Sequence, residues 1–214
     1  MLRSLVGSEM CIRDRFIPIA EETDLIVELG EWVLQKVCQT LANDTLGLIP
    51  GRMAVNISPR HFMHPGFLDS VQHIVQTTGV NPERLTFEVT ETLWIHDLFD
   101  VVEKMRILTK TGIHFSLDDF GTGYSSLTYI KHLPIHELKI DKTFVQDAPK
   151  SKDSAALVES ILAVARHMNL QVVAEGVETR EQADFLSARG YVVYQGYFFC
   201  RPEPFDQWIK RITE

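Results

Sequence analysis

The sequence predicts an α/β fold, a TIM-like (β/α) barrel that is incomplete at its N-terminus. Three observations predict this fold. Short β-rich runs alternate six times with helical segments, which favours parallel strands. Polar residues interrupt these runs near their C-terminal ends. In a barrel the C-terminal ends of the strands converge on one face, whereas in an open doubly wound sheet they spread along a line, so a barrel explains the polar residues better. A complete barrel of eight units takes about 250 residues, and this chain has 214.

The first residues do not fit this fold. Residues 1–15 show no clean periodicity, so we expect a non-native or disordered tail there and begin the domain, residues 16–214, at Phe16. Beyond Phe16, Pro18 suits a first helical turn, and apolar residues repeat at helical spacing as far as Val37. The sequence therefore predicts one helix of about 20 residues at the start of the domain.

Six runs predict the strands that follow, and a helix is expected after each of them. The runs are 53–58, 85–90, 114–119, 137–141, 171–177 and 191–197. Thr179 and Gln182 predict a capping box, and Ser125 or Ser126 can cap a helix that runs through Leu133. Another helix is predicted from an apolar stripe that comprises Val158, Ile161, Leu162, Ala165 and Met168.

Composition narrows the class of protein. The net charge of −8 argues against a partner such as a DNA or RNA polymer, because neutralising phosphates requires clustered Lys and Arg. The three cysteines lack a CxxC spacing, so they predict neither a disulfide framework nor a zinc site and fit a reducing, cytoplasmic location. No run of 18 apolar residues predicts a membrane span in this segment, although a longer parent protein is free to carry an anchor.

Polar side chains gather where the predicted strands end. The set comprises Asn56, Glu88, Asp118, Asp119, Lys139, Asp141, Glu175 and Gln195. Its carboxylate and amide oxygens suit Mg²⁺ or Mn²⁺ better than zinc. Two carboxylates about 4 Å apart repel by roughly 4 kcal/mol at an effective dielectric near 20, so we expect a divalent cation among them. For any single acid the alternative is a helix cap or a surface carboxylate, and for Lys139 it is an ion pair with an acidic neighbour.

Two pairs of histidines have spacings that also suit a metal. They are His61 with His64 and His132 with His136. No acidic partner completes either motif, and Pro134 interrupts the second pair, so we interpret all four as loop or surface residues.

Seven motifs follow one another along the chain: FIPIAEET (16–23), VNIS (55–58), FEVTET (87–92), DDFGTGYSSL (118–127), LKIDKTFV (138–145), VVAEGVET (172–179) and QGYFFCRP (195–202). In this order they resemble the signature motifs of the EAL domain family. They cover nearly all of residues 16–214, and several unrelated motifs in register are far more specific than one pattern. The resemblance implies a partial EAL-type barrel that hydrolyses the cyclic dinucleotide c-di-GMP to linear pGpG.

The resemblance also implies roles for the matching residues. Metal ligation, by two Mg²⁺ or Mn²⁺ ions that support in-line attack of water at phosphorus, falls to Asn56, Glu88, Asp118, Asp119 and Glu175. Catalysis is assigned to Lys139, which orients or activates the water, together with Asp119 and Glu175. Glu91 holds the DDFG loop, and Asp141 and Gln195 complete the pocket. A homodimer through the DDFG loop and the helix after it is a further implication.

The chain departs from the family at one point. The tripeptide E-A-L occurs nowhere in it, although the family places that Glu, a metal ligand, on a strand upstream of FIPIAEET. Loss of a residue that merely supports a metal ligand costs about 10- to 100-fold in affinity or activity, so we expect impaired activity from a truncated chain. Two alternatives stay open: a non-catalytic c-di-GMP-binding or regulatory module, and an unrelated Mg²⁺-dependent barrel enzyme.

Overall fold

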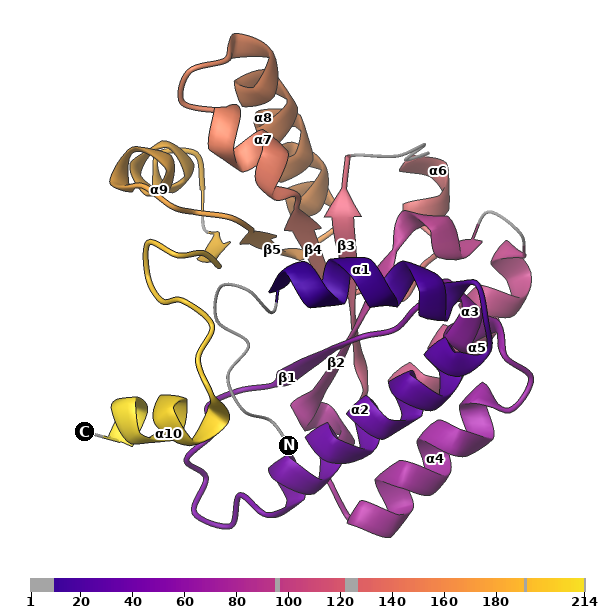
Figure 1. Cartoon of the computed structure of the whole chain (residues 1–214). Coiled ribbons are helices and arrows are strands. Elements are labelled where there is room, and N and C mark those ends of the chain that lie inside the picture. The colour runs from indigo at the N-terminus through magenta and orange to yellow at the C-terminus, as the bar shows by residue number, and fades with distance from the viewer. Residues whose placement is uncertain (1–9, 95–96, 122–126, 191, 214) are drawn as a thin grey trace. The chain divides into compact units, whose positions relative to one another are not determined.

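The strands of the protein form one sheet that follows the order of the sequence. The computed structural model describes residues 10–94, 97–121, 127–190 and 192–213 (Figure 1). The strand order is β1-β2-β3-β4-β5-β6, and β3–β4, β4–β5 and β5–β6 are parallel pairs. The predicted α/β class with parallel strands is therefore confirmed. The chain divides into two compact units, Met1–Phe87 with Ile107–Ile113 and Pro202–Glu214, and Glu88–Arg106 with His114–Arg201.

Helices α2 and α4 of the first unit lie side by side (Figure 1). Phe62, Phe67 and Phe87 are fully buried in this unit, and the ring of Phe67 lies 4.8 Å from that of Phe62 and 6.5 Å from that of Phe87. The elements of this unit are α1 (Met10–Glu21), α2 (Leu25–Ala42), β1 (Met53–Asn56), α3 (Pro59–Met63), α4 (Phe67–Thr78), the 3-10 turn η1 (Pro82–Arg84), the start of β2 (Leu85–Thr90) and α10 (Phe205–Thr213).

The single helix expected at the start of the domain is wrong, because the chain turns between α1 and α2. The backbone N–H of Glu22 donates to the carbonyl of Pro18, and the N–H and hydroxyl of Thr23 both donate to that of Ala20. A threonine side chain that competes for backbone partners favours a helix end, which explains the break. Pro18 lies inside α1, and α1 begins at Met10. That residues 1–15 are non-native stays a prediction.

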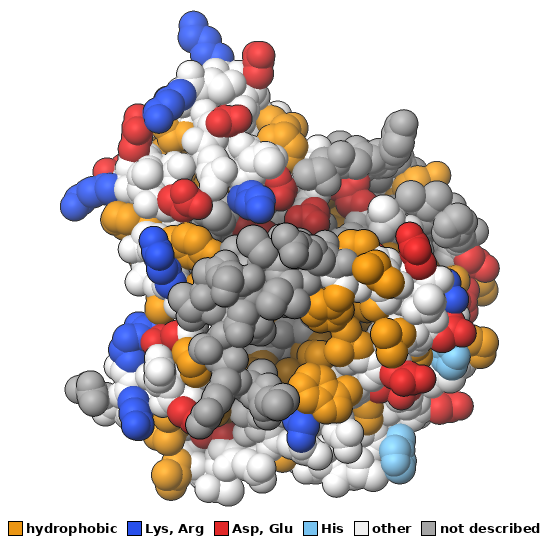
Figure 2. All heavy atoms as spheres, in the orientation of Figure 1, with side chains coloured by type: hydrophobic (Ala, Val, Ile, Leu, Met, Phe, Trp, Pro, Cys, Tyr) orange, Lys and Arg blue, Asp and Glu red, His pale blue; other side chains and the backbone are white. Residues whose placement is uncertain are grey.

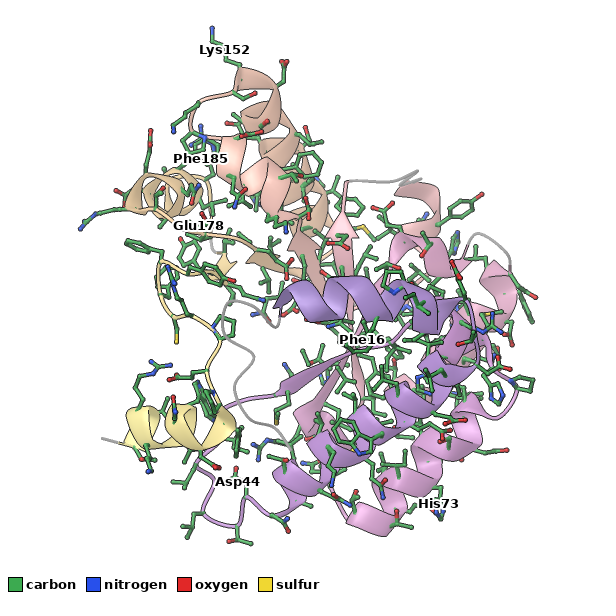
Figure 3. All side chains as sticks on the ribbon, viewed as in Figure 1. Phe16, Asp44, His73, Lys152, Glu178 and Phe185 are labelled. Carbon is green, nitrogen blue, oxygen red and sulfur yellow. The ribbon has the colours of Figure 1, made fainter. Side chains whose placement is uncertain are left out.

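The loop after α2 is held by Asp44, which Figure 3 labels. The Asp44 carboxylate accepts from the backbone N–H of Leu48 at 2.7 Å and of Ile49 at 3.1 Å, and from Nη2 of Arg84 at 3.3 Å. Arg84 also donates to the carbonyl of Gly51 at 2.8 Å. These bonds tie the segment before β1 to the turn before β2 and so fix where both strands begin.

His61 is buried, which corrects its interpretation as a loop or surface residue. Only 1% of it is exposed, and its ring stands edge-on to Phe67 at 5.0 Å. Gly30 of α2 makes room for it, because a Cβ at that position would lie 2.3 Å from Nδ1 of His61. Among the described residues neither ring nitrogen has a hydrogen-bond partner. Histidine spacing carries no information on burial, which the packing of α2, α3 and α4 decides.

Helices α7 and α8 of the second unit contact each other, and α8 also packs on β4 and β5 (Figure 1). On the face seen in Figure 2, acidic and basic side chains lie side by side over these helices. The elements are the end of β2, η2 (Glu91–Trp94), α5 (Leu98–Lys110) apart from its last residues, β3 (His114–Phe120), α6 (Leu127–Ile130), β4 (Glu137–Ile140), α7 (Lys142–Asp147), α8 (Lys152–His167), β5 (Gln171–Ala174), α9 (Arg180–Ser187) and β6 (Val193–Tyr194).

The helix signals of the sequence are largely confirmed. The predicted stripe of α8 is buried apart from Met168, which is half-buried beyond the end of the helix. The predicted capping box of Thr179 and Gln182 is present and begins α9. Phe185 of this helix, labelled in Figure 3, has the guanidinium carbon of Arg189 3.6 Å from the centre of its ring. Helix α6 ends at Ile130, before Leu133, and its expected caps Ser125 and Ser126 lie outside the described residues.

The strand predictions agree with the structure except at the C-terminal end. The run 191–197 yields only the two-residue strand β6, because Gly196 packs against the backbone of Val177, where a Cβ would lie 2.1 Å from the Val177 carbonyl oxygen. In the part of the chain that the structure describes, no helix is both long and apolar enough to cross a bilayer.

Candidate active site

Four strands of the sheet bring polar side chains to one edge. Glu88 is the fourth residue of β2, Asp118 and Asp119 lie near the end of β3, Lys139 is the third residue of β4, and Glu175 follows β5 directly. Neighbouring parallel strands end at the same edge of a sheet, so these residues, far apart in the sequence, lie close together.

Lys139 lies at the centre of this group. Its Nζ is 2.8 Å from Oε1 of Glu88, 3.1 Å from Oδ1 of Asp118 and 2.6 Å from Oε1 of Glu175. Only 3% of Lys139 is exposed, so its ammonium has these carboxylates in place of water. The ion pair that the sequence left as an alternative for Lys139 is therefore present, with three acidic partners instead of one.

Burial and neighbouring charges shift the pKa values in this group. Burial alone would lower the pKa of Lys139, but the charges of Glu88 and Asp118 and the hydrogen bonds that the ammonium donates to Glu175 and Glu88 outweigh it and raise that pKa, so the ammonium stays charged. Burial raises the pKa of Glu88 and Glu175, and the nearby Lys139 only partly offsets it. The ammonium of Lys139 is shared among three carboxylates, those of Glu88, Asp118 and Glu175.

The acidic side of the group fits a divalent cation. One carboxylate oxygen from each of Asp118, Asp119 and Glu175 lies within 4.8 Å of the other two, and hard oxygen donors at this spacing suit Mg²⁺ or Mn²⁺. Burial, followed by the charges of Asp118 and Asp141, raises the pKa of Asp119. The backbone of Asp119 has a φ of 52°, in the left-handed region that costs energy for any residue but glycine. Such strain is common where a side chain is held for function.

Glu91 and Asp141 brace the segments next to this group. Oε1 of Glu91 accepts from the backbone N–H of Gly121 at 3.0 Å, which ties η2 to the start of the DDFG loop. Asp141 is buried and caps α7, accepting from the backbone N–H of Thr143 at 2.9 Å and from the Thr143 hydroxyl. The expectation that Glu91 organises the loop thus has a matching contact.

Two of the expected site residues are exposed. Gln195 follows β6, and its backbone N–H donates to the carbonyl of Ala174 at 2.9 Å while its side chain is exposed. Asn56 is the exposed last residue of β1, in the first unit. The structure brings together Glu88, Asp118, Asp119, Lys139 and Glu175, and metal ligation by Asn56 stays a prediction.

The sequence reasoning missed one pair beneath Lys139. Oγ of Ser116, on β3, donates to Oε1 of Glu137, on β4, at 2.9 Å. A signal was present, because Glu137 stands two residues before Lys139 in a strand whose other residues are buried. The predicted site comprised only residues at or near the ends of strands.

The family model described as EAL domain matches residues 6–202 of this chain. The bifunctional diguanylate cyclase/cyclic di-GMP phosphodiesterase MucR of Pseudomonas aeruginosa is 41% identical over 203 residues, which are 93% of this chain and 29% of that protein. The cyclic di-GMP phosphodiesterase NbdA of the same species is 38% identical over 192 residues, 89% of this chain and 24% of that protein. The chain thus spans less than a third of either relative.

Solved structures show the same likeness. The PaMucR phosphodiesterase in complex with c-di-GMP superimposes with a TM-score of 0.85 and 42% identity, over 92% of this chain and 80% of that one. The EAL enzyme Bd1971, in its form bound to cAMP and cyclic-di-GMP, gives a TM-score of 0.88 and 30% identity, over 94% of this chain and 55% of that one. These likenesses confirm the predicted TIM-like fold class of the EAL type.

Proposed function

This chain belongs to the EAL domain family, and from that premise we propose that it hydrolyses c-di-GMP to the linear dinucleotide pGpG. The observation that carries the proposal is the buried ammonium of Lys139, surrounded by the carboxylates of Glu88, Asp118 and Glu175. A module that only binds its ligand has no need of a buried cation among strand-end acids, whereas phosphodiester hydrolysis needs charge control at this place.

The proposal assigns divalent cations to the acidic side of the group. Glu88, Asp118, Asp119 and Glu175 would hold them, with Asn56 as a further ligand. When bound there, Mg²⁺ or Mn²⁺ ions would supply a water that ionises near neutral pH and would neutralise charge on the phosphodiester. The oxygen donors within 4.8 Å of one another support this assignment, as do the three carboxylates that share one ammonium.

The residues of the chain divide the remaining work. Lys139 orients the attacking water and offsets charge that develops on the phosphoryl oxygens, and Asp119 and Glu175 hold the reacting centre. Glu91 keeps the DDFG loop in place through its bond to Gly121. Asp141 and Gln195 contact the dinucleotide. Because a charged donor aimed at developing negative charge contributes several kcal/mol to catalysis, Lys139 is the residue on which the rate depends most.

Two further parts of the proposal concern the setting of the domain. We expect a homodimer through the DDFG loop and the helix after it, although loop residues 122–126 lie outside the described residues. We also expect a cytoplasmic location, which the buried thiol of Cys38 supports, since a reducing compartment keeps thiols unpaired.

A turnover assay tests the proposal. The chain is incubated with c-di-GMP and either Mn²⁺ or Mg²⁺, and pGpG is separated by chromatography. We expect cation-dependent formation of pGpG that Lys139→Ala abolishes. Arg180→Ala is the matched control, because it removes a cation that is paired with Asp184 at the surface.

A second arm uses the chain joined to an N-terminal segment that contains an E-A-L strand, where turnover should be faster. Tight binding of c-di-GMP without turnover in both arms would contradict hydrolysis and favour the regulatory module. Neither binding nor turnover would favour an unrelated barrel enzyme.

A further inference from the structure

Glu137 shares a face of β4 with Lys139. Side chains alternate along a strand, so residues two apart point to the same side of the sheet. Leu138, Lys139 and Ile140 are buried, and Glu137 is half-buried at the start of the strand. Strands of parallel sheets are mostly apolar on both faces, and a carboxylate on the same face as a buried ammonium is therefore unusual.

Ser116 holds this carboxylate in place. Ser116 is completely buried on β3 and is the register partner of Glu137 on β4. Its hydroxyl donates to Oε1 of Glu137 at 2.9 Å. A buried hydroxyl that donates its hydrogen bond to a carboxylate fixes the orientation of that carboxylate, because turning the carboxylate away would leave the buried hydroxyl without a partner.

The charge of Glu137 reaches the Lys139 group. It is one of the charges that raise the pKa of Glu88, after burial and the nearby Asp118. Oε1 of Glu88 lies 2.8 Å from Nζ of Lys139. Glu137 is therefore a negative charge close to Glu88, on the same face of β4 as Lys139.

The ammonium needs such a charge once cations bind. All three carboxylates that pair with Lys139 are those to which the proposed function assigns divalent cations. Cations on these carboxylates repel the ammonium, which is 3% exposed and has no water to move into. The Glu137 carboxylate is engaged by the hydroxyl of Ser116 and is not among the carboxylates to which the proposed function assigns cations, so its charge stays available to Lys139.

We propose that Glu137, held by Ser116, is a positioning residue that keeps the ammonium of Lys139 in place when divalent cations occupy Glu88, Asp118 and Glu175. The inference rests on the proposed function for the presence of these cations. Without Glu137, Lys139 depends wholly on the carboxylates that the cations need, and it competes with the cations for them.

Calorimetric titration with Mn²⁺, in the absence of any dinucleotide, tests the inference. Glu137→Gln keeps an oxygen for the bond from Ser116 and loses the charge, and we expect it to weaken Mn²⁺ binding about tenfold. Ser116→Ala keeps the charge but frees the carboxylate, and it should weaken binding less, by roughly threefold. Glu159→Gln is the matched control, since it removes one acid of α8 that pairs with Arg189. The Mn²⁺ affinity of this variant should equal that of the wild type.

A double-mutant cycle with Lys139→Met separates this role from a direct pull on the cation. In that background Glu137→Gln should no longer change Mn²⁺ affinity, because no ammonium remains to compete. If circular dichroism shows that Lys139→Met does not fold, the two single variants test the inference instead. A larger loss of Mn²⁺ affinity in Glu137→Gln than in Ser116→Ala supports it, and the reverse order contradicts it. Wild-type affinity in Glu137→Gln, or an undiminished effect in the Lys139→Met background, would overturn the inference.

The two proposals fail in different ways. If the wild type binds Mn²⁺ with these effects yet forms no pGpG, Glu137 keeps its role and the proposed hydrolysis falls. If the wild type forms pGpG and Glu137→Gln has unchanged Mn²⁺ affinity, the hydrolysis stands and the role of Glu137 falls. A wild type that binds no Mn²⁺ overturns both.

Discussion

The two units of the chain bury polar side chains in opposite ways. In the first, the imidazole of His61 lies among aromatic rings, and within the described residues it has no hydrogen-bond partner. In the second, the ammonium of Lys139 has three carboxylates within 3.1 Å. The difference follows from chemistry, because an imidazole can discard its charge near neutral pH whereas an ammonium among acids keeps it.

This comparison separates stability from function. The buried ring of His61 leaves two nitrogen atoms without a hydrogen bond within the described residues, which lowers stability, but the ring fills space between α2, α3 and α4. The Lys139 group costs the desolvation of several charges, which a well-packed apolar set would avoid. Chemistry at the strand ends, as proposed above, accounts for such a group better than stability does.

The largest expected effect comes from Lys139→Met, which breaks the paired side of the comparison. It leaves three buried carboxylates without their ammonium, so the free energy of unfolding without metal should fall by about 3–5 kcal/mol. Turnover should be lost, while Mn²⁺ should bind more tightly because its competitor is gone. Urea denaturation and calorimetry measure these effects, and unchanged stability would show that the ion pairs are not formed in solution.

Phe67→Ala should have a similar effect on stability through the apolar side. Removing this buried ring leaves a cavity between Phe62 and Phe87 and should lower the free energy of unfolding by about 3–5 kcal/mol. In contrast to Lys139→Met, the rise in melting temperature that Mn²⁺ causes should equal that of the wild type. A changed response to Mn²⁺ would count against treating the two regions as separate.

Gly30→Ala sharpens the view of His61. The added Cβ would meet Nδ1 of His61 at 2.3 Å, and the buried ring has little room to move, so we expect a loss of about 1–3 kcal/mol. In a His61→Ala background the same change should cost less, because the ring that it meets is gone. Urea denaturation of the four proteins gives the coupling, and additive losses would refute the contact.

The smallest expected effect is on pH dependence. Burial, with His64 adding to it and Glu31 opposing it, lowers the pKa of His61 in the folded state below the usual value of about 6.5. The folded state then binds fewer protons than the unfolded chain. Above about pH 6.5 His61 is neutral in both states and does not lower the free energy of unfolding. As the pH falls from there towards the folded pKa, the unfolded chain gains the proton first, so the free energy of unfolding should decrease.

His61→Phe should remove this contribution, so its free energy of unfolding should fall less between pH 7 and 5 than that of the wild type. Denaturation in urea at several pH values checks this. Parallel curves for the two proteins would mean that His61 is not buried as a neutral ring.

The site could be predicted from the sequence as far as it lies on strand ends. Short β-rich runs placed Glu88, Asp118, Asp119, Lys139 and Glu175 at the ends of parallel strands, and the structure brings these five together. The partners of Lys139 could not be predicted, because they depend on which strands are neighbours. The spacing of Glu137 from Lys139 was visible in the sequence, but its bond to Ser116 could not be predicted, since the register between two strands joins them.

The helices show the same division. The stripe of α8 and the capping box of α9 were predicted because period and caps are local signals. The turn between α1 and α2 was not predicted. The apolar residues continue at helical spacing through it, whereas the hydrogen bond of the Thr23 hydroxyl, which favours the end of α1, leaves no trace in that spacing.

The sequence by itself determined the order of strands and helices, the family and the kinds of side chain at the strand ends, because these depend on local pattern and residue chemistry. Only the tertiary structure decided that Lys139 pairs with three acids, that Ser116 holds Glu137 and that His61 lies buried against Gly30. Each of these depends on distances between residues far apart along the chain, and packing alone sets such distances.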